Sequence, residues 1–272
     1  MNRDQYLSDR SVRDFIEWIK PRLCNPGCFS HSYKMPGNRV VTFNSIYDAF
    51  TQYEWGNADF NQTSKTLDCF AARLKAAANA NDPHAFRSAC EDILSWGGVR
   101  RGNQSLIRAL GPKVVTVFKQ AAKQLNPQRA DCTHLGNLRV TVAQGEMRYL
   151  MSSGFTKIYS LMISGFPMYD GRVGAALGLL SRMFCQAKGL GSVPANLAFP
   201  WGQGRSRIRD ASRGTLRYVR FNGRPLLQAE WNLKAAWLVG ELCQHGCFGK
   251  LPENQRLRAL EAALFMIGYD VS

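Results

Sequence analysis

Apolar side chains recur at helical spacing along most of this chain, as expected for helices with one buried face. Residues 8–20 illustrate the pattern, because Val12, Phe15, Ile16 and Ile19 fall on one side of a helix. The same spacing predicts helices over residues 8–20, 63–79, 82–96, 170–184, 226–244 and 252–267, and a further helix after Gly111. An Asp followed by Pro at the start of residues 82–96 is a typical helix-start signal.

A second pattern lies in the middle of the chain. Apolar positions begin at Leu135 and continue to Met151, Gly154 follows, and further apolar positions end at Met162. This order predicts a helix, a glycine turn and a second helix. Asp170 then stands where the next helix is expected to begin.

Extended patterns are rare in this sequence. Only residues 39–43 and 215–222 have them, and these segments would form either small hairpins or loops. No apolar run approaches the roughly 20 residues that a membrane-spanning helix needs, so no contact with a membrane is expected. The expected fold class is therefore mainly α, in two lobes. The expected segments are a helical lobe over 1–130, the helix–turn–helix and Asp170 over 131–188, a Gly/Arg-rich loop or small hairpin over 189–225, and helices over 226–272 that pack on the core.

Charge separates residues 189–225 from the rest of the chain. The protein has 35 Lys and Arg against 20 Asp and Glu, a formal charge of +15. Residues 189–225 hold six glycines but only one acidic residue, Asp210, beside seven arginines: Arg205, Arg207, Arg209, Arg213, Arg217, Arg220 and Arg224. Guanidinium groups bind phosphate oxygens, and Phe199 and Trp201 offer rings on which bases could stack, so this segment is a candidate nucleic-acid surface. The alternative is a solvated loop whose arginines pair with acidic residues elsewhere.

The cysteines leave metal binding open. Cys24 and Cys28 are four residues apart, as are Cys243 and Cys247, which loosely resembles paired zinc ligands. The N-terminal residues lack the apolar stretch of a secretory signal, so a cytoplasmic protein with mostly reduced thiols is expected. Because no metal or cofactor motif is present, we expect no cofactor.

The sequence around Asp170 supports a more specific interpretation. It has no phosphate-binding glycine loop and no nucleophile elbow, and its four histidines are scattered. Residues 149–184, with Gly154, Lys157 and the run from Phe166 to Asp170, resemble the helix-hairpin-helix DNA glycosylase superfamily, especially bacterial proteins with an 8-oxoguanine-glycosylase fold. The resemblance implies double-stranded DNA with a modified or damaged base as partner, a monomer, and abasic-site formation.

The resemblance also implies residue roles. Asp170 would be the catalytic carboxylate, and Lys157 a possible Schiff-base lysine. The hairpin residues Gly154 and Thr156, together with Arg172, would contact DNA with Arg205, Arg207, Arg209 and Arg213. Tyr169, Phe199 and Trp201 would line or stack in the base pocket.

Alternatives remain for each role. Cleavage of an N-glycosidic bond builds positive charge on the sugar, and a carboxylate beneath it would stabilise that charge. The alternative is that Asp170 only caps a helix and Lys157 only binds phosphate. The substrate would be an oxidised purine such as 8-oxoguanine, with Lys157 as lyase, or a bulky base such as glucosylated hydroxymethylcytosine in phage DNA during antiviral defence. A DNA-binding module without catalysis is the competing class.

Overall fold

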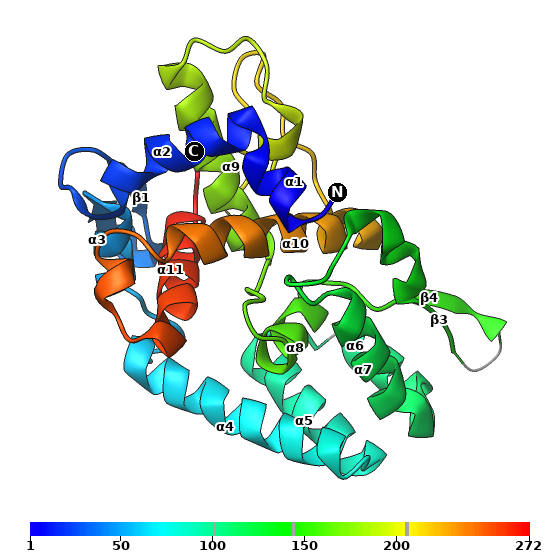
Figure 1. The fold of residues 1–272 in the computed structure, drawn as a ribbon. Helices are drawn as coiled ribbons and strands as arrows, with labels where there is room; N and C mark the ends of the chain where they lie inside the picture. Colours follow the sequence, from blue (N-terminus) through cyan, green and yellow to red (C-terminus); the bar gives the residue numbers. More distant parts are fainter. Residues whose placement is uncertain (101, 143–144, 205–206) are drawn as a thin grey trace. The chain divides into compact units, whose positions relative to one another are not determined.

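The computed structural model describes residues 1–100, 102–142, 145–204 and 207–272, which are mainly helical (Figure 1). They form two compact units. Unit 1 comprises residues 1–3, 61–168 and 224–236, and unit 2 comprises residues 4–60, 169–223 and 237–272. Each unit combines segments that are far apart in the sequence, so neither coincides with a single consecutive range such as 1–130.

Unit 1 is built around helix α5. Its elements include most of α4 (Phe60–Asn79), α5 (Pro83–Trp96), α6 (Asn103–Ala109), α7 (Val114–Gln124), α8 (Phe155–Met162) and the first turns of α10 (Pro225–Leu242). Helix α5 packs against α6, α7 and α8. The Phe118 ring lies 5.6 Å from Phe86, 5.7 Å from Phe155 and 5.6 Å from Tyr159 at the centre of this core.

The start signal of α5 is confirmed. The Asp82 carboxylate accepts hydrogen bonds from the backbone N–H groups of His84, at 2.9 Å, and Ala85, at 3.0 Å. These bonds satisfy two amides that have no partner within the helix.

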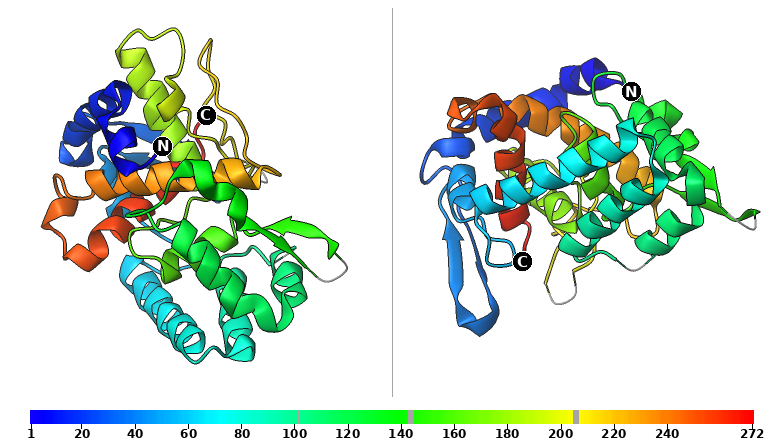
Figure 2. Two further views of the ribbon diagram at one scale, coloured as in Figure 1. Left: turned by 45° about the vertical axis from the view of Figure 1, so that its right-hand side comes forward. Right: turned by 90° about the horizontal axis from the view of Figure 1, so that it is seen from below.

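The prediction of a helix that begins at Leu135 is wrong. The chain there forms a short 3₁₀ helix, η3 (Cys132–Leu138), and then a hairpin of β3 (Arg139–Thr141) and β4 (Met147–Tyr149) that projects from the helices of unit 1 (Figures 1 and 2). The β-branched residues of β3 favour strand, and Gly145 has a positive φ of 75°. Helix α8 is therefore preceded by a strand, and the expected helix, glycine turn and helix are not formed there.

Unit 2 contains the N-terminal and C-terminal helices. It includes most of α1 (Arg3–Ser8), then α2 (Arg10–Cys24), α3 (Ile46–Thr51), α9 (Gly171–Ala187), the end of α10, and α11 (Glu253–Ile267). Helix α11 packs against α3 and α9, and α2 packs against the same two helices. The predicted helices over 8–20, 170–184 and 252–267 correspond to α2, α9 and α11.

The extended segment at 39–43 is confirmed as a strand. β1 (His31–Lys34) and β2 (Val40–Phe43) pair antiparallel, with Lys34 opposite Val40, in a hairpin that stands out from the helices of unit 2 (Figure 2). Residues 215–222 are a loop, the second of the two alternatives. Their only ladder contacts within the described part of the chain are single bridges from Leu216 to Arg213 and from Arg220 to Trp201.

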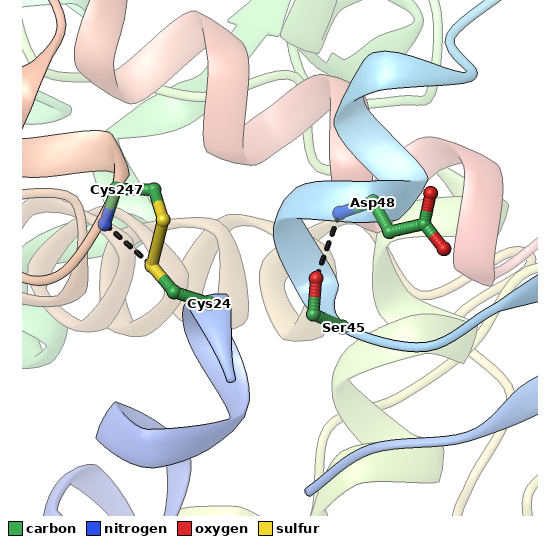
Figure 3. The surroundings of a disulfide bond; sticks show 4 residues. All are labelled: Cys24, Ser45, Asp48 and Cys247. Atoms are coloured by element: carbon green, nitrogen blue, oxygen red, sulfur yellow. Dashed lines mark hydrogen bonds between the residues drawn. A yellow bond between two sulfur atoms is a disulfide. The ribbon is translucent and has the colours of Figure 1, made fainter. Parts of the chain in front are cut away.

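One pair of cysteines in unit 2 is joined. Cys24 at the end of α2 and Cys247 before α11 form a disulfide with a Cα–Cα distance of 5.8 Å (Figure 3). The same view shows Ser45, whose hydroxyl accepts the Asp48 amide at 3.0 Å and caps α3. The disulfide therefore joins one cysteine from each of the two pairs noted in the sequence, Cys24/Cys28 and Cys243/Cys247. No group of three or more metal-ligating side chains occurs among the described residues.

Within the described ranges, no helix has both the length and the apolar character needed to cross a bilayer.

Candidate active site

Asp170 lies at the N-terminus of α9. Its Oδ1 accepts the backbone N–H groups of Arg172, at 2.9 Å, and Val173, at 3.2 Å, and its side chain is partly exposed. The helix-start prediction for this residue is confirmed. Two amide donors and the positive end of a 17-residue helix both stabilise negative charge at this position.

The carboxylate of Asp170 influences the pKa of two arginines of unit 2. Burial lowers the pKa of Arg172, and the Asp170 carboxylate is the strongest influence in the opposite direction. Burial also lowers the pKa of Arg209, again opposed by Asp170. Asp170 is thus a carboxylate at a helix N-terminus that interacts electrostatically with two largely buried arginines.

A glycine allows Arg209 and the loop to approach α9. A Cβ atom at Gly171 would lie 2.6 Å from the carbonyl oxygen of Gly202 and 2.7 Å from Nη1 of Arg209. Any side chain at Gly171 would therefore displace the loop from the first turn of α9. The packing places Arg209 beside Asp170.

Aromatic rings surround the Arg172 side chain. Its guanidinium carbon lies 4.1 Å from the ring centre of Phe265, 4.8 Å from that of Tyr269 and 5.6 Å from that of Trp55. We refer to Trp55, Phe265 and Tyr269 as the aromatic group. Each of these residues is partly exposed, and each ring contacts the side chain of Arg172, two residues after Asp170 in α9.

The arginines of residues 189–225 lie in different surroundings. Arg207 donates from Nε to the Tyr269 hydroxyl at 3.1 Å, and its guanidinium carbon is 5.0 Å from that ring. Arg209 is beside Asp170, whereas Arg213 is exposed in a tight turn closed by its bridge to Leu216. Arg205 lies outside the described residues. The structure thus associates Arg172, Arg207 and Arg209 with one site, but Arg213 is in a separate turn.

Tyr169, Phe199 and Trp201, which were expected to stack on bases, all contact other residues of unit 2. Tyr169 is fully buried and donates from its hydroxyl to the carbonyl oxygen of Pro200 at 2.7 Å. Phe199 is fully buried, with its ring 6.4 Å from that of Phe15. Trp201 is partly exposed and donates from Nε1 to the carbonyl oxygen of Tyr218 at 3.2 Å. Tyr169 and Phe199 therefore belong to the core of unit 2.

The three expected residues of the hairpin lie in unit 1. Gly154 precedes α8 with a negative φ of −81°, and a Cβ there would lie 2.3 Å from Nδ2 of Asn103. Thr156 is fully buried and donates to Oδ1 of Asn232 at 2.6 Å. Lys157 is 5% exposed, and its Nζ donates to the carbonyl oxygen of Ser153 at 3.2 Å.

These contacts show what the unit 1 residues do locally. Gly154 allows close packing, and its amide and that of Phe155 are bonded to the Ser152 hydroxyl at 3.2 and 3.1 Å. The Lys157 stem packs over Gly97, where a Cβ would lie 2.5 Å from Cδ of the lysine. The N-terminus of α8 is thus capped by its own chain.

The sequence patterns missed Phe265 and Tyr269 as members of this site. Phe265 and Tyr269 are four residues apart near the C-terminus, and Trp55 stands next to Gly56. The helical spacing of Phe265 and Tyr269 signals a shared face, but nothing in the pattern connects that face to residue 172.

Comparisons with known proteins identify no relative. No family model, no curated protein and no solved structure matches this chain.

Proposed function

We propose that this protein is a DNA glycosylase that cleaves the N-glycosidic bond of a modified or damaged base and leaves an abasic site. The observation that carries the proposal is the partly exposed Asp170 carboxylate at the start of α9, which interacts electrostatically with Arg172 and Arg209. The aromatic group surrounds the side chain of Arg172. The positive formal charge of +15 supports a polyanionic partner.

The chemistry assigns a role to each group. As the base departs, positive charge develops on the sugar at C1′, and the Asp170 carboxylate would stabilise that charge while water adds to C1′. Arg172 and Arg209 would place positive charge near that carboxylate. A base extruded from the duplex needs a stacking face in place of its neighbours, and the aromatic group would supply one.

The decisive experiment replaces Asp170 with Asn. Asn caps helices about as well as Asp, so Asp170→Asn keeps the start of α9 while removing the charge. Asp82→Asn is the matched control, because Asp82 caps α5 through two similar amide bonds in unit 1. We expect base release to fall by at least 100-fold in Asp170→Asn and to be unchanged in Asp82→Asn, consistent with a dominant electrostatic role.

The assay uses a panel of duplex DNAs, including oxidised purines and glucosylated hydroxymethylcytosine, with released bases identified by mass spectrometry. Equal release by wild type and Asp170→Asn would contradict the assignment of Asp170. No release from any DNA, with retained DNA binding, would favour a binding module instead.

Lys157 is tested separately. Borohydride traps an imine between a lysine and C1′ as a covalent adduct. An adduct that disappears in Lys157→Ala would establish the imine route through this residue, and base release without an adduct would make the enzyme monofunctional.

A further inference from the structure

A hollow in unit 2 lies beside the aromatic group. It has a volume of about 370 Å³ and is lined by Ser32, Lys34 and Val40 of the β1–β2 hairpin and by Arg207, Asp270 and Ser272. Its volume is within the range of small-ligand sites. Of these residues, Arg207 also belongs to the candidate site, but the cleavage chemistry proposed above does not use it.

The side chains that line the hollow include two cations, Lys34 and Arg207, and one carboxylate, Asp270. No ion pair within the described part of the chain engages either Lys34 or Arg207. Arg207 uses Nε on the Tyr269 hydroxyl, which leaves the two terminal nitrogens of its guanidinium for a ligand. Asp270 contributes one carboxylate, and its Oδ1 already accepts the backbone N–H of Ser272 at 3.2 Å.

These groups match the needs of a phosphate. A guanidinium binds two phosphate oxygens through parallel N–H donors, and an ammonium adds a point charge. The Ser32 and Ser272 hydroxyls are further donors at the rim.

Tyr269 connects the hollow to Asp170. Its hydroxyl accepts from Arg207, and its ring lies 4.8 Å from the guanidinium carbon of Arg172. The backbone N–H of Arg172 in turn donates to Asp170 at 2.9 Å. Tyr269 thus contacts both Arg207, which lines the hollow, and Arg172, which lies two residues after Asp170.

We propose that this hollow is a phosphate-binding subsite that holds a backbone phosphate of the DNA strand whose base is presented to Asp170. The inference rests on the proposed function, since it takes DNA as the source of the phosphate. Lys34 and Arg207 bind the phosphate oxygens, and the β1–β2 hairpin forms one wall of the subsite.

The test measures how DNA binding depends on salt. Each phosphate contact contributes about 0.9 to the slope of log K against log salt for duplex DNA. We expect Lys34→Gln to reduce the magnitude of that slope by about 0.9 on unmodified duplex, measured by fluorescence anisotropy. The control is Lys188→Gln, an exposed lysine of unit 2 at the end of α9, which should leave the slope unchanged.

A second arm distinguishes the source of the phosphate. Inorganic phosphate and a deoxynucleoside monophosphate are titrated into wild type and Lys34→Gln by calorimetry. If the wild type binds DNA and releases base but Lys34→Gln has an unchanged slope, the subsite is overturned and the proposed function stands. If wild type binds no DNA but binds phosphate through Lys34, the DNA source and the proposed function both fail. Binding of neither DNA nor phosphate would overturn both.

Discussion

The guanidinium carbon of Arg172 lies 4.1 Å from the ring centre of Phe265. Arg172 belongs to the first turn of α9 and Phe265 to the last turn of α11, two helices that pack together in unit 2. The contact therefore fixes an aromatic face beside the residue that donates its amide to Asp170. A cation held against a ring is worth about 0.5–1 kcal/mol at exposed sites and about 2 kcal/mol when it is desolvated, and Arg172 is largely buried.

Loss of the Phe265 ring should affect catalysis more than folding. We expect Phe265→Leu to lower kcat/KM for base release about tenfold, because stacking on an aromatic ring contributes about 1–3 kcal/mol per base. Phe70→Leu is the control, since Phe70 is also half-buried but lies in unit 1 with its ring 6.5 Å from Trp96. Equal effects of the two changes on kcat/KM would contradict a stacking role for the aromatic group.

The close packing at Gly171 predicts that one added methyl group lowers the stability of the protein markedly. Because a Cβ there would lie 2.6 Å from the Gly202 oxygen, we expect Gly171→Ala to destabilise the protein by about 1–3 kcal/mol in denaturant unfolding. In contrast, a Cβ at Gly240 of α10 meets nothing within 4 Å. Gly240→Ala should therefore stabilise by about 0.5–1 kcal/mol, and the same sign of change at both positions would argue against the close approach at Gly171.

The disulfide predicts redox-dependent stability. Cys24 and Cys247 are 223 residues apart in the sequence, so their link constrains the unfolded chain strongly. We expect Cys24→Ser to lower the free energy of unfolding by about 2–4 kcal/mol under oxidising conditions and to remove the effect of added reductant. The neighbouring Cys28 is exposed and unpaired, so Cys28→Ser should change neither quantity. Thiol labelling that finds both Cys24 and Cys247 free in the native protein would contradict this pairing.

His31 predicts a loss of stability in mild acid. Burial lowers the pKa of His31, and the hydrogen bond from its ring to the Asp270 carbonyl oxygen, at 2.8 Å, opposes that shift only in part. The unfolded chain therefore binds a proton more readily, and the neutral ring stabilises the fold fully above the unfolded pKa of about 6.5. As the pH falls below that value, this contribution is lost with a slope of at most about 1.4 kcal/mol per pH unit.

Chemical unfolding between about pH 5 and pH 7.5 measures the effect of His31. His31→Gln should flatten the dependence on pH, whereas His84→Gln should not, because His84 is exposed at the start of α5. A steeper loss of stability in acid for His31→Gln would show that the ring is not held in its neutral form.

The sequence predicted the helices with an explicit start signal best. Asp82 and Asp170 both cap helices where expected, because a capping side chain and the residues it caps are adjacent in the chain. The helix expected from Leu135 was wrong because sparse apolar spacing over residues 135–151 fits a helix and a hairpin equally. Apolar spacing therefore predicts a helix reliably only where apolar residues recur at every turn.

The candidate site was predicted in part for the same reason. Asp170 and Arg172 are close in the sequence and close in space, and both were recognised. Trp55 and Phe265 reach Arg172 only through the packing of unit 2, which no local pattern contains. Tyr169 and Phe199 were expected to stack on bases because they are aromatic and near the motif, yet burial assigns them to the core.

The first turn of α9 performs two tasks with adjacent atoms. Its amides fix the carboxylate at residue 170, while the side chain at residue 172 meets rings supplied by other segments. In the proposed glycosylase, exchange of those rings would change the surroundings of the base without moving the carboxylate proposed to act on the sugar. Replacements at positions 55, 265 and 269 would then change substrate preference on an unchanged helix start.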